Sequence, residues 1–388
     1  MTSALAGLTV VEIGGSETLY AGKLFADQGA DVVLVEPSGG HPSRRRQPLV
    51  GTQDAEAQDD VASAAFTYLN GAKRCVELPE NDAAARAALQ QLIGSADVVL
   101  GGGSPARLIG LGVDPDRLSA DRLVVTVTPF GWTGPWRDLA ADELVLNAMG
   151  GMMSLGGYWD GRPLQPPAGL AYASAGLFAA VGAMTHLLDA EVRPGHVDVS
   201  VQESVVMGLE NAAQFWDLEH TVRGRSGAKD TQVGRGVYAC GDGYVYLMLG
   251  LSAGSAFWAR FLNWLDDWQV EGREALAGEC WSERGFIESD AAKRLFRDVV
   301  ETMLRQHTRR ELTEAARRYA VPVAPVNRLE DVFADEQLEA RGYFVDVPRS
   351  DWRHGPGRAP TAPYRLSRTA ASTRYAPQDR QPSTGGSR

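Results

Sequence analysis

The hydrophobic pattern near the N-terminus alternates between short apolar runs and a stretch with helical spacing. The runs near 8–13 and 31–35 are rich in β-branched residues and are short enough for buried strands. Between them, apolar residues recur on one helical face as far as Gly29, a residue that commonly ends helices. A strand, a helix and a strand in such close succession predict a βαβ unit, so the two strands should be parallel and joined by a right-handed crossover.

The same alternation continues through RCVEL, NDAAARAALQQLIGSA, DVVLGG and RLVVTVTPFG. This succession predicts an α/β fold class, with a large Rossmann-like domain. The glycines after the first run, in EIGGSETLYAG, do not spell GxGxxG, and Glu17 stands where the phosphates of a dinucleotide would approach. A nicotinamide dehydrogenase is an alternative that this spacing does not favour.

The rest of the pattern predicts a second, smaller α+β domain in the middle of the chain. Residues 223–236 are rich in Gly and Arg, as in a linker, and GVYACGDGYVYLML predicts a hairpin followed by amphipathic helices. We expect a large domain over 1–222, a linker over 223–236 and a small domain over 237–320. Residues 321–367 should return to the large domain, and 368–388 should form a disordered tail.

The segment 169–188, GLAYASAGLFAAVGAMTHLL, carries no charged residue over about the length of a membrane span. It is rich in Ala and Gly, and Tyr, Ser, Thr and His interrupt it. We therefore interpret it as a helix buried on most faces, and we expect no membrane association.

Composition narrows the classes of partner. The 388 residues carry a formal net charge of −11, which argues against nucleic acid because phosphate binding needs a basic surface. Cys75, Cys240 and Cys280 show no CxxC or Cys/His spacing, so neither disulfides nor a metal site is expected. The N-terminus lacks the features of a signal peptide, and isolated thiols suit a reducing compartment, so we expect a cytoplasmic protein.

Six stretches, taken in order along the chain, resemble the family III CoA-transferases. They are ADQGADVVLVEPSGGHPSR, YLNGAKRCVEL, TPFGWTGPWRD, RPGHVDVSVQES, GDGYVYL and VPVAPVNRLEDVFADEQLEARGYF. That family includes formyl-CoA transferase, carnitine CoA-transferase and α-methylacyl-CoA racemase. The resemblance implies a large Rossmann-like domain built from both chain ends, a smaller middle domain and an interlocked, ring-shaped dimer.

The resemblance also implies a catalytic aspartate whose carboxylate attacks the acyl-CoA thioester and forms a mixed anhydride. In the family this aspartate stands four residues before a Gly that leads into an apolar helix. Here the Gly is Gly176, so the position falls on Tyr172. A phenol cannot form the anhydride, and with an ordinary pKa of about 10 it stays protonated at neutral pH. The nearest carboxylate upstream is Asp160, a second candidate for the role.

The family's CoA-binding positions are only partly filled. An Asn-Phe-Arg block of the family is replaced by Gly102, Gly103 and Ser104, a basic position by Gly110, and a frequent lysine by Ala140. The CoA ligands that remain by resemblance are Arg44 on the nucleotide side, Leu78 on the adenine side, and Lys73 and Arg74. The last two can equally fix local structure. Coenzyme A or an acyl-CoA should bind weakly, and no tightly bound cofactor is expected.

Two further acids match positions near the family's active site. Glu143 stands where the family has an acidic residue, and Asp142 stands where its racemase branch has a catalytic His. Racemisation needs two bases, and the second would be the missing aspartate, so racemase activity is not expected. Tyr172, Glu143 and Asp142 are the candidate catalytic residues.

Three functions fit these observations. The first is a non-catalytic subunit of a CoA-transferase, either as a homodimer or paired with a related catalytic chain. The second is an enzyme of altered chemistry that acts on an acyl or acyl-CoA substrate. The third is an active acyl-CoA:carboxylate CoA-transferase with a displaced nucleophile. The sequence does not name the acyl group or the pathway.

Overall fold

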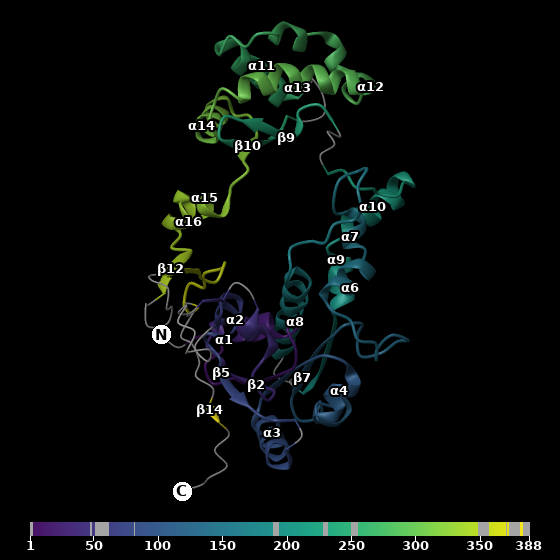
Figure 1. Cartoon of the computed structure of the whole chain (residues 1–388), viewed down its shortest axis with the longest axis vertical. Coiled ribbons are helices and arrows are strands. Elements are labelled where there is room, and N and C mark those ends of the chain that lie inside the picture. Colours follow the sequence, from purple (N-terminus) through teal and green to yellow (C-terminus); the bar gives the residue numbers. More distant parts are fainter. Residues whose placement is uncertain are drawn as a thin grey trace. The chain divides into compact units, whose positions relative to one another are not determined.

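The chain folds into two compact units in the computed structural model (Figure 1). The structure describes residues 3–46, 49–50, 62–80, 82–188, 194–227, 232–249, 255–347, 357–369, 371 and 381–382. Unit 1 comprises Met1–Ser154, Leu164–Arg223 and Glu336–Arg388, and unit 2 comprises Leu155–Pro163 and Gly224–Asp335.

A seven-stranded parallel sheet forms the centre of unit 1, in the order β14-β5-β2-β1-β6-β7-β8. In that order the strands are Gln381–Pro382, Arg74–Glu77, Asp31–Glu36, Thr9–Ile13, Val98–Gly102, Leu123–Thr128 and Gly195–Ser200. The predicted parallel pairing of the first two strands is confirmed, because β1 and β2 are neighbours in register Thr9 to Asp31. β1 also pairs with β6 on its other side, so the order reverses there. Open α/β sheets bind ligands at the carboxyl ends of strands at such a reversal.

Helices cover both faces of this sheet (Figure 1). Val10 packs toward α1, α6, α8 and α9, whereas Val11 packs toward α3 and α4. This alternation follows the two-residue period of a strand. The helices of unit 1 are α1 (Leu19–Asp27), α2 (Ala64–Asn70), α3 (Ala83–Ser95), α4 (Pro105–Gly110), α5 (Pro115–Leu118), α6 (Glu143–Met149), α8 (Leu170–Leu188), α9 (Val201–Met207), α10 (Glu210–Glu219) and α16 (Glu336–Ala340), with α7 (Met152–Leu155) at the division and the 3-10 turn η1 at Pro42–Arg45.

α8 is long and apolar enough to cross a membrane by length and composition. Its alanines at 171, 175, 179 and 183 are buried in the core of unit 1, one helical turn apart. Gly176 lets α8 approach α1 closely, since a Cβ there would lie 3.0 Å from the backbone nitrogen of Ala21. One face of α8 is therefore a core face of unit 1, and the opposite face carries exposed apolar side chains.

Unit 2 is built on a three-stranded antiparallel sheet in the order β11-β10-β9. The predicted hairpin is present, as β9 (Arg235–Cys240) pairs with β10 (Gly243–Met248), and β11 is Val323–Pro325. Aromatic side chains such as Trp258, Trp281 and Phe296 pack together in its core. Its helices are α11 (Ala256–Asp267), α12 (Arg284–Ile287), α13 (Asp290–Leu304), α14 (Arg309–Tyr319) and α15 (Leu329–Phe333), with 3-10 turns η3 (Arg273–Leu276) and η4 (Glu279–Ser282).

Two segments near the predicted domain limits belong to a different part of the structure from the one predicted. The sequence pattern has the chain return to the large domain at 321, but β11 adds to the sheet of unit 2, and unit 1 resumes at Glu336. β9 begins at Arg235, inside the stretch interpreted as a linker. In both cases a few residues without a clear strand pattern form backbone hydrogen bonds with a neighbouring strand of the sheet.

The C-terminal part of unit 1 contacts its N-terminal part. The hydroxyl of Tyr364 lies 2.6 Å from Nε2 of Gln28 at the end of α1. Tyr68 packs against the hairpin of β12 (Phe344–Val347) and β13 (Gly357–Pro360). A small hairpin, β3 (Leu49–Val50) with β4 (Ala62–Ser63), completes the unit. Most of the predicted tail, 368–388, lies outside the described residues, although its β14 pairs with β5.

Candidate active site

Tyr172 lies in the first turn of α8 and lines a cavity of about 640 Å³. Burial raises the pKa of its phenol, and the charges of Glu17, Glu143 and Asp142 raise it further. The phenol therefore stays protonated at neutral pH and can donate a hydrogen bond, but it is no nucleophile. The cavity is lined by Ser16, Leu19, Tyr20, Ser43, Arg46, Ala65, Tyr68, Leu69, Pro167, Ala168, Gly169, Leu170, Tyr172 and Ala173.

Glu143 and Asp142 both hold helix ends. The carboxylate of Glu143 accepts hydrogen bonds from the backbone amides of Gly169 (2.7 Å) and Ala171 (3.0 Å), at the start of α8. These are among the amide groups that a helix leaves without an internal partner. Asp142 is the N-cap of α6, and its carboxylate accepts from the amide of Val145 at 3.0 Å. Both acids lie near Tyr172, but each has a structural partner.

Arg44 is held by an acid of its own chain. Its Nε and Nη2 lie 2.6 and 2.5 Å from the two carboxylate oxygens of Glu36, at the end of β2. Burial disfavours the charge of Glu36, but the hydrogen bonds from Arg44 and from the amide of His41 outweigh burial and hold its pKa below the ordinary value. Glu36 occupies the place where dinucleotide-binding folds present an acid to a ribose. Because Arg44 and His41 occupy both of its oxygens, Glu36 gives no support to the dehydrogenase alternative.

Lys73 is buried, whereas its neighbour Arg74 is exposed. Lys73 has no exposed surface, and its Nζ lies 2.7 Å from Oε2 of Glu12 and 2.9 Å from the carbonyl oxygen of Leu19. Arg74 forms an exposed pair with Asp31 at 2.7 Å. A side chain without exposed surface cannot contact a ligand, so the structure gives Lys73 a structural role and not the CoA contact that the resemblance suggests.

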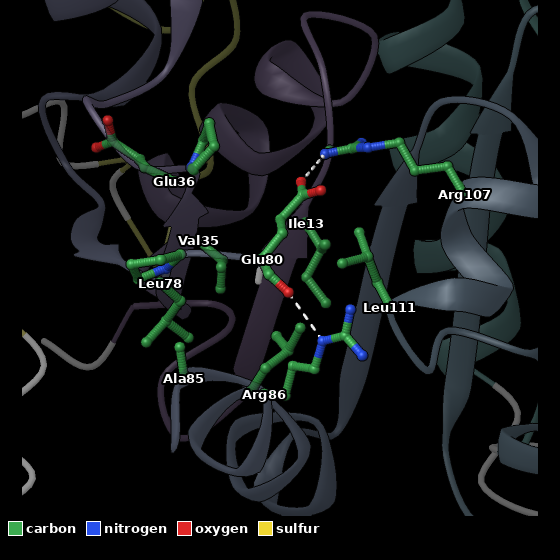
Figure 2. A pocket seen from close by; sticks show the side chains of 13 residues that line it. Ile13, Val35, Glu36, Leu78, Glu80, Ala85, Arg86, Arg107 and Leu111 are labelled. Carbon is green, nitrogen blue, oxygen red and sulfur yellow. Dashed lines mark hydrogen bonds and ion pairs between the residues drawn. The ribbon is translucent and has the colours of Figure 1, made fainter. Parts of the chain in front are cut away.

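Leu78 lines a small pocket at the carboxyl ends of β1 and β2 (Figure 2). We call this the nucleotide-side pocket; it is lined by Ile13, Gly14, Val35, Glu36, Pro37, Leu78, Pro79, Glu80, Ala85, Arg86, Leu89, Arg107 and Leu111. Figure 2 shows Glu80 between Arg107 and Arg86, and the Arg107 to Glu80 ion pair measures 2.7 Å. The remaining space is about 20 Å³, no more than a single water needs.

Comparison with known proteins identifies the family. The model of CoA-transferase family III matches residues 5–383. The chain belongs to CoA-transferase family III.

Among relatives of this family III chain are subunits of larger enzymes. It is 34% identical over 344 residues to the succinyl-CoA:(R)-benzylsuccinate CoA-transferase subunit BbsE of Thauera aromatica, covering 86% of this chain and 82% of the relative. It is 27% identical over 370 residues to the succinyl-CoA–L-malate CoA-transferase beta subunit of Chloroflexus aurantiacus, covering 90% and 85%. A CAIB/BAIF family protein from Brucella suis has the same fold, with 24% identity and a TM-score of 0.81 over 97% of this chain and 96% of that one.

Three of the residues that the resemblance places at altered CoA positions, Gly102, Gly103 and Ser104, have structural functions. Ser104 is the N-cap of α4, and its Oγ accepts from the amide of Arg107. Gly102 allows β6 to pass close to Thr18, because a Cβ there would lie 2.8 Å from the Thr18 methyl carbon. Gly103 has a φ of 112°, which favours glycine. By contrast, a Cβ on Gly110 would meet nothing within 4 Å, so packing does not require a glycine there.

Sequence reasoning missed Glu36, Glu80 and Arg107, which close the nucleotide-side pocket. Of these three residues, only Glu36 gave a local signal, as the acid that ends the second predicted strand. The alternative acid, Asp160, is exposed in the Leu155–Pro163 segment of unit 2. Among the described residues, no group of three or more His, Cys, Asp and Glu side chains is arranged to hold a metal ion.

Proposed function

We propose that this chain is a subunit of a family III CoA-transferase that does not form the acyl-enzyme and works beside a related chain that does. The observation that carries the proposal is Tyr172, a partly buried phenol that lines the cavity at the place where the resemblance puts the family's aspartate. Two of the nearby carboxylates do not replace it, because Glu143 and Asp142 cap α8 and α6. Covalent transfer through a mixed anhydride needs an ionised carboxylate, and burial raises the pKa of the third nearby acid, Glu17, which opposes its ionisation.

The nucleotide-side pocket supports the same proposal. Arg44 is paired with Glu36, Lys73 is buried against Glu12, and Arg107 is paired with Glu80. Charge-assisted hydrogen bonds to a phosphate are worth about 1.5–3 kcal/mol each, so internal pairing of these cations weakens CoA binding. A chain that leaves acyl transfer to its partner has no need of such contacts.

An apolar surface on unit 1 supports association with another chain. The packed helices α6, α8 and α9 carry large apolar side chains that are about half exposed: Leu144, Val145, Leu177, Phe178, Val181, Val206 and Met207. Apolar patches of this kind mark interfaces more often than free surface. The resemblance implies a dimer in this family, and two relatives are named as subunits. We therefore infer a second family III chain as the partner and not a free monomer.

One observation favours a second candidate, an enzyme of altered chemistry. The cavity beside Tyr172 is large enough for a small acyl group, and three tyrosines, two serines and Arg46 line it. In such an enzyme the phenol of Tyr172 would donate a hydrogen bond to the substrate and would not attack it.

Co-expression with a family III chain that carries Asp at the position of Tyr172 tests the proposal. We expect native mass spectrometry to show both chains in one complex, and succinyl-CoA-dependent transfer to a carboxylic acid in the complex only. Changing the partner's aspartate to Asn should abolish transfer. Transfer by this chain alone, or a complex that stays active after the partner's change, contradicts the proposal.

The apolar surface is tested within the same complex. Phe178→Asp places a charge on the exposed face of α8 and should dissociate the two chains. Gln91→Asp, an exposed change on α3 across the sheet, is the matched control and should leave the complex intact. Equal stability of both variant complexes would rule out this surface as the interface.

A further inference from the structure

Glu17 lies where the order of the strands reverses, just beyond the end of β1. Gly14 brings the chain so close to β6 that a Cβ on it would lie 2.5 Å from the backbone nitrogen of Gly102. Glu17 therefore projects from the segment that crosses the carboxyl ends of β1 and β6, the place where this class of fold binds ligands.

Glu17 is a partly exposed residue whose Oε2 atom is buried. Its Oε2 has no hydrogen-bond partner among the described residues. Burial raises its pKa, and a backbone hydrogen bond and the charge of Arg107 only partly oppose this effect. Natural structures seldom leave a buried polar atom unsatisfied unless its site has a use.

The backbone around Glu17 is shaped to accept its side chain. A Cβ on Gly15 would lie 2.2 Å from Oε2 of Glu17, and a Cβ on Gly102 would lie 3.5 Å from the same atom. The carboxyl group thus lies over the glycine backbone at the ends of both strands.

Glu17 lies close in the chain to residues that line two cavities of unit 1. Gly14 lines the nucleotide-side pocket, and Ser16 lines the cavity of Tyr172. The charge of Arg107 acts on Glu17 from the first side, and Glu17 acts on the phenol of Tyr172 on the second. A ligand that reached from Arg107 to the phenol of Tyr172 would therefore come close to this side chain.

We propose that Glu17 excludes CoA thioesters from this chain by occupying the passage between the nucleotide-side pocket and Tyr172. This inference rests on the proposed function, in which the chain itself does not process acyl-CoA. The part of CoA between its nucleotide and its thioester is an uncharged amide chain. Exclusion therefore works by the volume of the side chain and not by its charge.

Calorimetric titration of the full chain with CoA and with acetyl-CoA tests this inference in three forms: wild type, Glu17→Gln and Glu17→Ala. The glutamine variant keeps the volume and removes the charge, so its affinity should stay within about threefold of wild type. The alanine variant empties the passage and should bind both ligands at least about tenfold more tightly. Thermal unfolding of each variant verifies that the fold is kept.

Each outcome separates this inference from the proposed function. Unchanged affinity of Glu17→Ala, or equal tightening of both variants, would overturn the role of Glu17 and leave the proposed function standing. Acyl transfer by the unmixed wild-type chain would overturn the proposed function and, with it, the exclusion of CoA thioesters.

Discussion

Two cavities of unit 1, the nucleotide-side pocket and the cavity of Tyr172, are lined by residues close together in the chain, Gly14 and Ser16. They differ in free volume and in whether their charged groups pair with one another. The nucleotide-side pocket has about 20 Å³ of free space, and its charged groups pair with one another: Glu36 with Arg44 and Glu80 with Arg107. The cavity of Tyr172 has about 640 Å³, and its phenols and Arg46 surround open space. In this family III chain, the cavity beside Tyr172 is open, while the cations that the resemblance assigns to CoA are paired with acids of the same chain.

The two ion pairs differ in how firmly they close the nucleotide-side pocket. Glu80 and Arg107 are each about 40% exposed, and exposed pairs contribute only about 0–1 kcal/mol. Glu36 is 1% exposed and Arg44 16%, so water screens their attraction much less. A nucleotide could displace the Glu80 to Arg107 pair at small cost, but Glu36 would keep Arg44.

The largest effect is expected at the buried pair of Lys73 and Glu12. Lys73→Met leaves Glu12 buried without its cation and should lower the free energy of unfolding by about 3–5 kcal/mol. Arg74→Ala, the neighbouring change, breaks only an exposed pair and should cost about 0–1 kcal/mol. Urea unfolding followed by circular dichroism measures both, and similar losses in the two variants would contradict the structural role of Lys73.

The next effect concerns CoA itself. Two lost phosphate contacts of about 1.5 kcal/mol each reduce affinity about a hundredfold relative to a family member that has them. Calorimetry of the isolated wild-type chain with acetyl-CoA should therefore show no low-micromolar binding. Binding at that level would mean that the nucleotide-side pocket opens readily and would remove the contrast between the two cavities.

Glu143→Gln tests whether this acid stabilises the start of α8. Glutamine keeps one acceptor oxygen but loses the charge that two amides share, so we expect a loss of about 2 kcal/mol in stability. Asp142→Asn, which retains a good helix cap, is the control and should cost less than about 0.5 kcal/mol. A variant at 143 that keeps its melting temperature but loses transfer activity in the complex would assign the chemistry to Glu143.

Tyr172→Phe separates the two candidate functions. In a non-catalytic subunit the hydroxyl is only a packing group with a hydrogen bond, so stability should fall by at most about 1–2 kcal/mol and the complex should stay active. In an enzyme of altered chemistry, activity should fall by roughly 10²-fold. Transfer rates of the complex with wild-type Tyr172 and with the phenylalanine variant distinguish the two.

The smallest effect expected is a pH dependence from Glu17. Because burial raises its folded-state pKa, the folded chain holds this proton to higher pH than the unfolded chain does. Its contribution to stability is present below the ordinary pKa of Glu and is lost as pH rises through the folded-state value. Unfolding of wild type and Glu17→Gln across this range should show a fall with pH that the variant lacks; parallel curves would contradict it.

Local patterns in the sequence predicted much of the fold and a position for the site. Alternating apolar runs determined β1, α1 and β2, because burial of a strand or of a helical face depends on the period of nearby residues. The spacing to Gly176 led to the prediction that Tyr172 stands at the nucleophile position, and the structure places Tyr172 in the first turn of α8 beside a cavity. The absence of CoA-binding cations stays a prediction from the resemblance, since each is a single position in a linear motif.

Only the tertiary structure decided how those residues are used. Lys73 was a candidate CoA ligand until Glu12, far from it in the sequence, proved to pair with it in the core. Glu143 proved to cap a helix that begins 27 residues later, at Leu170, and β11 proved to join β10 across a gap of many residues. The sequence determined the elements because they form from neighbours, whereas burial, pairing and the place of Glu17 near two cavities depend on contacts between distant segments, which no local pattern records.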